Sequence, residues 1–105
     1  MSSTRLTQLE EYYRQDPEDP FNIYALALEY LGADKQKSKE LFKILLDRHE
    51  DYVATYYHAG KLWEELGDTA GALHIYNRGI ECARRRNDSK ALRELKSAHD
   101  ELSSD

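Results

Sequence analysis

One spacing of large and small side chains occurs twice in this chain, and it restricts the possible folds more than any other feature of the sequence. Each copy has large and small residues at intervals of three, four and seven positions, followed by a small and an aromatic residue four positions apart. The copies are Ile23, Leu26, Ala27, Tyr30, Ser38 and Phe42, and then Tyr56, Ala59, Gly60, Trp63, Ala72 and Tyr76. Such intervals place side chains on one face of a helix. Each copy therefore predicts two helices that pack closely where the small residues lie.

Short turns separate the predicted helices. Pro17 and Pro20 disfavour helix at the residues before them, and Asp19 is suited to cap a helix that has Pro20 at its first position. Ser3 or Thr4 is available as a cap for the first helix. The turn at 32–34 closes the second helix, and the run 87–89 caps the sixth. We expect helices over residues 4–15, 20–31, 35–48, 52–66, 69–86 and 88–103.

Length and composition indicate one folded helical domain. The 105 residues are 40% hydrophobic and 33% charged, with only five Gly and two Pro, which is typical of a helical protein with one core. Connections of a few residues force neighbouring helices to pack antiparallel. We predict a single domain over residues 1–105, with an N-terminal half-repeat helix (4–18), two repeats (19–51 and 52–86) and a C-terminal capping helix (88–103).

The repeated spacing resembles the tetratricopeptide repeat (TPR) family, which has an aromatic residue, a small pair and a second aromatic on one helix, then a small residue and an aromatic on the next. The family pattern also has a proline eight residues after the last aromatic, and Pro17 stands eight residues after Leu9. The chain departs from the pattern at three positions. Arg5 stands where the first helix should have a small residue, and Glu50 and Arg84 stand where the two repeats should have a proline. The resemblance implies an all-α fold of antiparallel helix-turn-helix repeats, a TPR-like α-solenoid.

The resemblance further implies that the first helix of each pair lines a concave groove where partners bind. The groove-facing residues are then Tyr24, Leu28, Leu31, Tyr57, Lys61, Glu64, Lys90 and Arg93. The last two follow if the C-terminal helix continues the series and packs through Leu92, Leu95 and His99. Such a floor suits an extended peptide held by tyrosine stacking, with a carboxylate gripped by Lys61 and Arg93. The alternative is that the tyrosines are half-buried packing residues and the lysines ordinary solvated charges.

We therefore expect a protein-interaction module, an adaptor that holds a protein or peptide partner. The alternative is a self-associating, homo-oligomeric scaffold, because two or three repeats lie near the minimum for stability. Enzymatic function is not expected, and neither is a cofactor or a metal. No glycine-rich phosphate loop occurs, and the four histidines fit no zinc signature. Cys82 is predicted to be a small core residue.

Charge and targeting signals restrict the partners and the compartment. A net charge of -5 argues against a nucleic-acid partner, because proteins that bind nucleic acids usually have a basic surface that neutralises the phosphates. The N-terminus has no apolar signal region, and no stretch approaches the ~18 apolar residues that cross a bilayer, so no membrane partner is expected. The single cysteine fits a reducing compartment, which predicts a cytoplasmic location.

Overall fold

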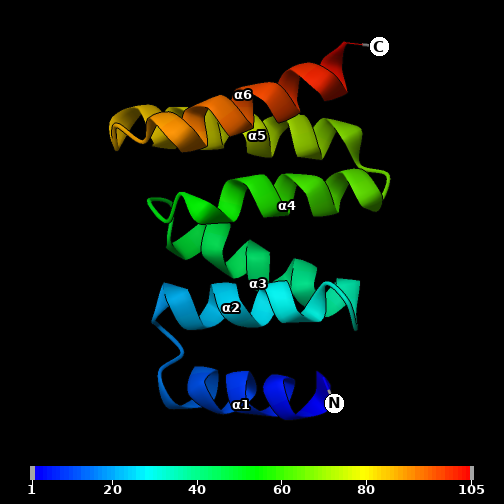
Figure 1. Ribbon diagram of the computed structural model, residues 1–105, viewed down its shortest axis with the longest axis vertical. Coiled ribbons are helices and arrows are strands. Elements are labelled where there is room, and N and C mark those ends of the chain that lie inside the picture. Colours follow the sequence, from blue (N-terminus) through cyan, green and yellow to red (C-terminus); the bar gives the residue numbers. More distant parts are fainter. Residues whose placement is uncertain (1, 105) are drawn as a thin grey trace. The chain divides into compact units, whose positions relative to one another are not determined.

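The computed structural model describes residues 2–104, and these contain six helices and no strand (Figure 1). The helices are α1 (Ser2–Gln15), α2 (Pro20–Tyr30), α3 (Lys35–Arg48), α4 (Ala54–Glu65), α5 (Thr69–Arg85) and α6 (Ser89–Ser103). The predicted all-α fold is confirmed. The chain divides into two compact units, Met1–His49 and Glu50–Asp105. We describe each unit separately, and the predicted single domain with its internal repeat boundaries stays a prediction.

Aspartates begin four of the six helices. Each of these N-cap carboxylates accepts hydrogen bonds from backbone N–H groups of its own helix. Asp19 accepts from Phe21 (3.0 Å), and Asp34 accepts from Gln36 (3.1 Å) and Lys37 (3.2 Å). Asp68 accepts from Gly71 (2.8 Å), and Asp88 accepts from Ala91 (3.0 Å). Each such cap stabilises its helix by about 1 kcal/mol. Asp34, expected only to close the turn after α2, therefore also starts α3. Asn87 was expected to help cap α6, but it adopts a φ of 57° and ends α5.

Three predicted helix starts are corrected. Helix α1 begins at Ser2, so Ser3 and Thr4 lie inside it and the predicted cap is wrong. Helix α4 begins at Ala54 rather than at position 52, because the N–H of Thr55 donates to the carbonyl of Tyr52 at 3.2 Å in a tighter, three-residue turn. Helix α6 begins at Ser89, one residue late, because Asp88 is its cap. Helices α2, α4 and α5 each end one residue before the predicted position.

In the first unit, α2 packs against both α1 and α3. The core of this unit contains the wholly buried residues Ile23, Ala27, Ser38, Phe42 and Leu45. Ser38 stands at the small-residue position of the repeat, and its hydroxyl donates a 2.7 Å hydrogen bond to the carbonyl of Ala27. A serine in this place allows α2 and α3 to approach closely while its own polar atom is satisfied.

Helix α1 is joined to α2 by a phenol–carboxylate hydrogen bond. The buried Tyr30 donates to Oε2 of Glu10 at 2.5 Å. This bond is the main reason that the pKa of Tyr30 rises to about 12, and burial adds to the shift. Because the folded-state pKa lies above the unfolded value of 10.0, the stabilisation is complete below pH 10 and is lost as the pH rises through 12.

We expect the stability advantage of the unaltered protein over Tyr30→Phe to shrink by about 1–2 kcal/mol between pH 9 and pH 12. The estimate is lower than the full shift would give, because Glu10 is exposed to solvent. Urea unfolding of both proteins across this range measures the difference, and Tyr12→Phe, at an exposed tyrosine, is the control. An advantage that stays constant with pH would contradict the role of this hydrogen bond.

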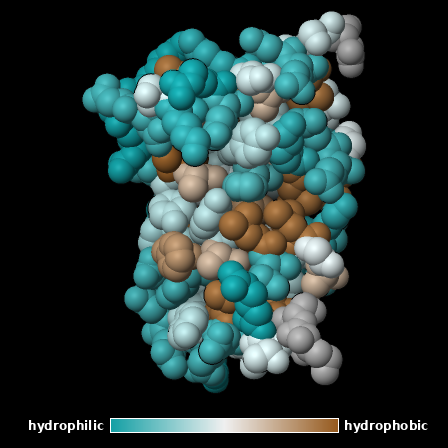
Figure 2. Space-filling view, in the orientation of Figure 1, coloured by the Kyte–Doolittle hydropathy of each residue, from teal (hydrophilic) through white to brown (hydrophobic). Residues whose placement is uncertain are grey.

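In the second unit, α5 packs against α4 and α6, and α6 also contacts α4. Two glycines allow α4 and α5 to approach each other. A Cβ atom on Gly60 would lie 2.2 Å from the ring of Tyr76, and one on Gly79 would lie 2.5 Å from Cβ of Tyr56. Helix α6 buries Leu95 and Ala98, and the face of α6 seen in Figure 2 is mainly hydrophilic.

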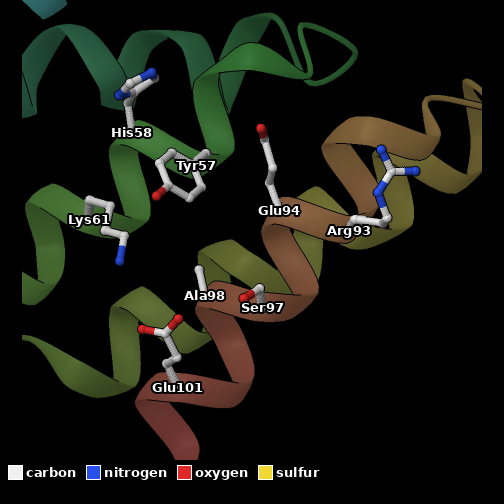
Figure 3. A pocket seen from close by; sticks show the side chains of 8 residues that line it. All are labelled: Tyr57, His58, Lys61, Arg93, Glu94, Ser97, Ala98 and Glu101. Carbon is white, nitrogen blue, oxygen red and sulfur yellow. The ribbon is translucent and has the colours of Figure 1, made fainter.

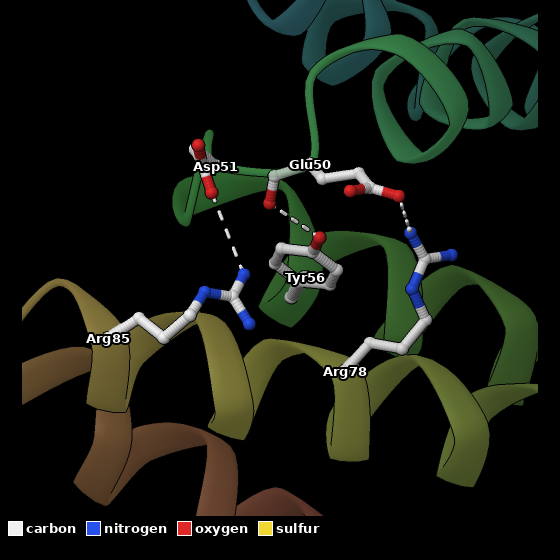
Figure 4. A network of polar contacts seen from close by, with 5 residues as sticks. All are labelled: Glu50, Asp51, Tyr56, Arg78 and Arg85. Atoms are coloured by element: carbon white, nitrogen blue, oxygen red, sulfur yellow. Dashed lines mark hydrogen bonds and ion pairs between the residues drawn. The ribbon is translucent and has the colours of Figure 1, made fainter.

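A polar network connects the segment before α4 to α5 (Figure 4). The phenol of Tyr56 donates to the carbonyl of Glu50 at 2.7 Å, while Arg78 pairs with the Glu50 carboxylate at 3.9 Å and Arg85 with Asp51 at 3.6 Å. Burial raises the pKa of Tyr56, and the nearby Arg78 opposes this shift. The exposed ion pairs contribute little individually, so the buried Tyr56 is the main anchor of this segment.

Within residues 2–104, no helix is long and apolar enough to span a lipid bilayer.

Candidate functional site

Helices α4 and α6 form the two walls of a pocket in the second unit (Figure 3). Its volume is about 480 Å³. The lining residues are Tyr57, His58 and Lys61 from α4, and Arg93, Glu94, Ser97, Ala98 and Glu101 from α6. Tyr57 and Lys61 are four positions apart on α4, and Glu94, Ser97, Ala98 and Glu101 are separated by three, four and seven positions on α6, which places each set on one face.

The α4 wall combines an aromatic ring with a cation. Lys61 lies over the face of Tyr57, with Nζ 5.6 Å from the ring centroid, and its ammonium is 3.9 Å from the carboxylate of Glu64. The ring of His58 meets that of Tyr57 edge to face, with the centroids 5.5 Å apart. These contacts restrict the side chains before any partner arrives, which lowers the entropy cost of using them in binding.

The α6 wall combines small residues with two carboxylates. Glu94 and Glu101 extend from α6 toward the α4 side, and the short side chains of Ser97 and Ala98 lie between them (Figure 3). Arg93 extends on the side of Glu94 that is away from Tyr57 and Lys61. The small residues open the hollow between the helices, and the acidic residues stand at its two ends.

Burial and nearby carboxylates affect the titratable groups of the site. Burial lowers the pKa of His58, and the carboxylate of Glu94 acts in the opposite direction. Burial also raises the pKa of Tyr76, whose hydroxyl donates to the Glu64 carboxylate at the edge of the pocket. His58 is therefore neutral at pH 7, and Glu64 is held in place by Tyr76 and Lys61.

Three of the residues that the repeat spacing assigned to a binding face line this pocket: Tyr57, Lys61 and Arg93. Glu64 borders it through Lys61. The exposed Lys90 does not line it. In the first unit, Tyr24, Leu28 and Leu31 are all half-buried, so each retains some surface for contact.

Sequence reasoning missed His58 and most of the α6 wall. The packing face of α6 was predicted at Leu92, Leu95 and His99, but the most buried residues are Leu95 and Ala98, while Leu92 and His99 are half-buried. Glu94 and Glu101 lie beside this buried face and line the pocket. The run Glu94, Ser97, Ala98 and Glu101 has helical spacing, and that was the available signal.

Two solved structures are similar to this chain over most of its length. One is the solution NMR structure of a tetratricopeptide repeat domain protein from Salinibacter ruber, 46% identical with a TM-score of 0.81, over 85% of this chain and 91% of that chain. The other is a crystal structure of a tetratricopeptide repeat domain protein from the same organism, 44% identical with a TM-score of 0.79, over 83% of this chain and 98% of that chain. The chain belongs to the tetratricopeptide repeat family. No family profile and no curated protein matches the sequence.

Membership of the tetratricopeptide repeat family explains the core positions. The aromatic and small residues of both copies are buried, from Ile23 to Phe42 in the first unit and from Tyr56 to Tyr76 in the second. Tetratricopeptide repeat domains generally act as protein-interaction modules rather than as enzymes. Among residues 2–104, no group of three His, Cys, Asp or Glu side chains is arranged to hold a metal ion. Cys82 is buried, as predicted, and burial raises its pKa.

A second pocket lies in the first unit, with a volume of about 390 Å³. Helices α1, α2 and α3 contribute to it, and its lining is more apolar than that of the pocket between α4 and α6. The residues are Glu10, Tyr13, Leu26, Tyr30, Lys37, Glu40, Leu41 and Ile44. None of them belongs to the face that the repeat spacing assigned to binding.

Proposed function

We propose that this tetratricopeptide repeat protein is an adaptor that binds a protein or peptide segment in the pocket between α4 and α6. One observation carries the proposal. The resemblance to tetratricopeptide repeats assigned Tyr57, Lys61 and Arg93 to a binding face, and these residues line a single pocket. A binding role accounts for that convergence better than the reading of these residues as unrelated packing and surface groups.

The chemistry of the pocket supports a peptide ligand. Half-buried Tyr57 presents an aromatic surface for contact at a low entropy cost. Polar groups at the rim, among them Arg93, Glu94 and Ser97, are exposed and suited to hydrogen bonds with a peptide backbone or side chains. By the same repeat spacing we assign Tyr24, Leu28 and Leu31 to the binding face of the first unit. We also propose a cytoplasmic location, because a single cysteine fits a reducing compartment.

We expect the double substitution Tyr57→Ala and Lys61→Ala to reduce partner capture by about tenfold or more. The Tyr57 ring and the aliphatic stem of Lys61 supply the apolar wall of the pocket, and the substitution removes both. Affinity capture from a lysate of the source organism, followed by identification and titration of the partner, measures the loss. Circular dichroism should show unchanged helicity, because neither residue belongs to the buried core.

A matched control is available at two exposed positions of the first unit. The double substitution Tyr12→Ala and Lys43→Ala removes the same chemical groups outside the pocket, and it should leave capture unchanged. Equal capture by the unaltered protein and the pocket variant would contradict the assignment of the binding site.

Self-association is the second candidate function. Phe21 is 60% exposed and Tyr12 is 49% exposed. The side chain of Asn22 donates to the carbonyl of Tyr12 at 3.3 Å, which brings the segments that carry the two aromatic residues together. Two exposed aromatic residues form a surface on which a second copy of the chain would bury apolar area. Recovery of the protein with only itself in the capture experiment would favour this candidate.

A further inference from the structure

We propose that the segment bound between α4 and α6 is basic, with two Lys or Arg side chains that pair with Glu94 and Glu101. The inference rests on the proposed function, since it names the chemistry of the partner for the same pocket. It differs from the expectation that Lys61 and Arg93 grip a carboxylate, because the surroundings of both cations are now known.

The cation of Lys61 is already compensated. Its ammonium lies 3.9 Å from the carboxylate of Glu64 and over the ring of Tyr57. In Figure 3 the side chain of Glu101 also extends toward it from α6. An incoming carboxylate would therefore meet Glu64 and Glu101 close to the single ammonium. Like charges in close proximity cost free energy, so this end of the pocket disfavours an anion.

Arg93 does not complete an anion site with Lys61. Residues next to each other on a helix do not share a face, and Arg93 extends away from Tyr57 and Lys61 while its neighbour Glu94 extends toward α4. Within residues 2–104, neither Glu94 nor Glu101 forms an ion pair. His58, the other nitrogen base of the lining, is neutral at pH 7. Glu94 and Glu101 thus line the pocket and Glu64 borders it, while the ammonium of Lys61 is the one cation of the described residues that lies between them.

The spacing of the two unpaired carboxylates fits two basic side chains of an extended peptide. Glu94 and Glu101 are seven positions apart on α6, which corresponds to about 10.5 Å of helical rise. Side chains on one face of an extended segment repeat at about 7 Å, and the long stems of Lys and Arg bridge the difference. Successive side chains of an extended segment point to opposite faces, so the side chain between them would point away from α6, toward Tyr57 on the α4 wall.

The net charge of the whole chain also favours a basic partner. A net charge of -5 attracts a cationic segment during encounter, and salt weakens that attraction.

The test uses three short peptides with blocked ends, titrated into the full chain at low ionic strength. The first has two arginines separated by one tyrosine, the second has glutamates in place of the arginines, and the third has glutamines. We expect measurable binding of the basic peptide, weakening with added salt, and no binding of the acidic one. Glu94→Gln combined with Glu101→Gln should weaken binding of the basic peptide about fivefold to thirtyfold.

Two further variants separate charge at this site from net charge. Glu81→Gln combined with Asp100→Asn changes the net charge equally at exposed positions outside this pocket, and binding of the basic peptide should change less than twofold. Lys61→Gln removes the ammonium, so it should strengthen binding of the basic peptide. A carboxylate-gripping pocket would show the opposite response to Lys61→Gln, because its ligand would lose the cation.

The outcomes distinguish this inference from the proposed function. An acidic peptide that binds and is weakened by Lys61→Gln would overturn the basic partner while supporting the pocket. Absence of binding by the basic peptide, or equal weakening in the control variant, would also overturn the basic partner. The capture experiment with the Tyr57 and Lys61 double variant judges the proposed function independently.

Discussion

Replacing Tyr76 by Ala is expected to lower the free energy of unfolding by about 3–5 kcal/mol, because it removes a fully buried ring that packs between α4 and α5. Tyr76 is 0% exposed, its ring lies against Gly60, and its hydroxyl donates to the carboxylate of Glu64. The substitution leaves a cavity and takes away a partner of Glu64. Since small domains have about 5–15 kcal/mol in total, this loss is a large part of the stability.

Urea unfolding followed by circular dichroism measures the effect, and two substitutions divide it into its parts. Tyr76→Phe keeps the ring and removes the hydroxyl, so it should cost about 1–2 kcal/mol. Tyr12→Ala, at an exposed tyrosine of the first unit, should cost less than about 0.5 kcal/mol. Losses of similar size for Tyr76→Ala and Tyr12→Ala would show that the Tyr76 ring does not hold the helices together.

Adding a single methyl group at Gly60 is the second prediction. Gly60→Ala should destabilise the protein by about 1–3 kcal/mol, although Ala favours a helix over Gly by about 1 kcal/mol. The new Cβ would lie 2.2 Å from the ring of Tyr76, and that ring is fixed by complete burial and by its bond to Glu64. Either α4 and α5 separate or the ring leaves its position.

The same substitution is expected to reverse its sign when the ring is absent. In a Tyr76→Ala background the three atoms nearest to the new methyl group, all of the Tyr76 ring, are absent, so Gly60→Ala should stabilise by about 0.5–1 kcal/mol through helix propensity. Gly32→Ala is the matched control, because no atom lies within 4 Å of the position that its Cβ would occupy. If Gly60→Ala destabilised both backgrounds equally, close packing against Tyr76 would not be the cause.

Most of the fold could be predicted because helices are local structures. The repeated spacing of aromatic and small residues identified the buried positions of both units, including Ala59, Gly60 and Trp63. Asp19 and Pro20 identified the start of α2. Errors concentrated at helix ends, where hydrogen bonds of the turn decide the boundary. Asp34 is an example, since its carboxylate belongs to α3 although its sequence position suggested the end of α2.

The candidate site was predictable only where the repeat pattern applied. Tyr57 and Lys61 lie beside core positions of a well-matched repeat, so their shared face followed from the helical period. The capping helix α6 has no such match, so the resemblance did not indicate which of its polar residues lie beside α4. Glu94, Ser97 and Glu101 were therefore missed.

The sequence by itself thus determined the all-helical repeat fold, the small and aromatic core positions, and the shared face of Tyr57 and Lys61 on α4. Only the tertiary structure decided which face of α6 meets α4, which cation is already paired, and which carboxylates stand free. Helical period and core spacing act between residues close in sequence, and they leave a pattern that a single chain displays. The rotation of a terminal helix and the balance of charges across a pocket depend on packing between distant residues, which leaves no such pattern.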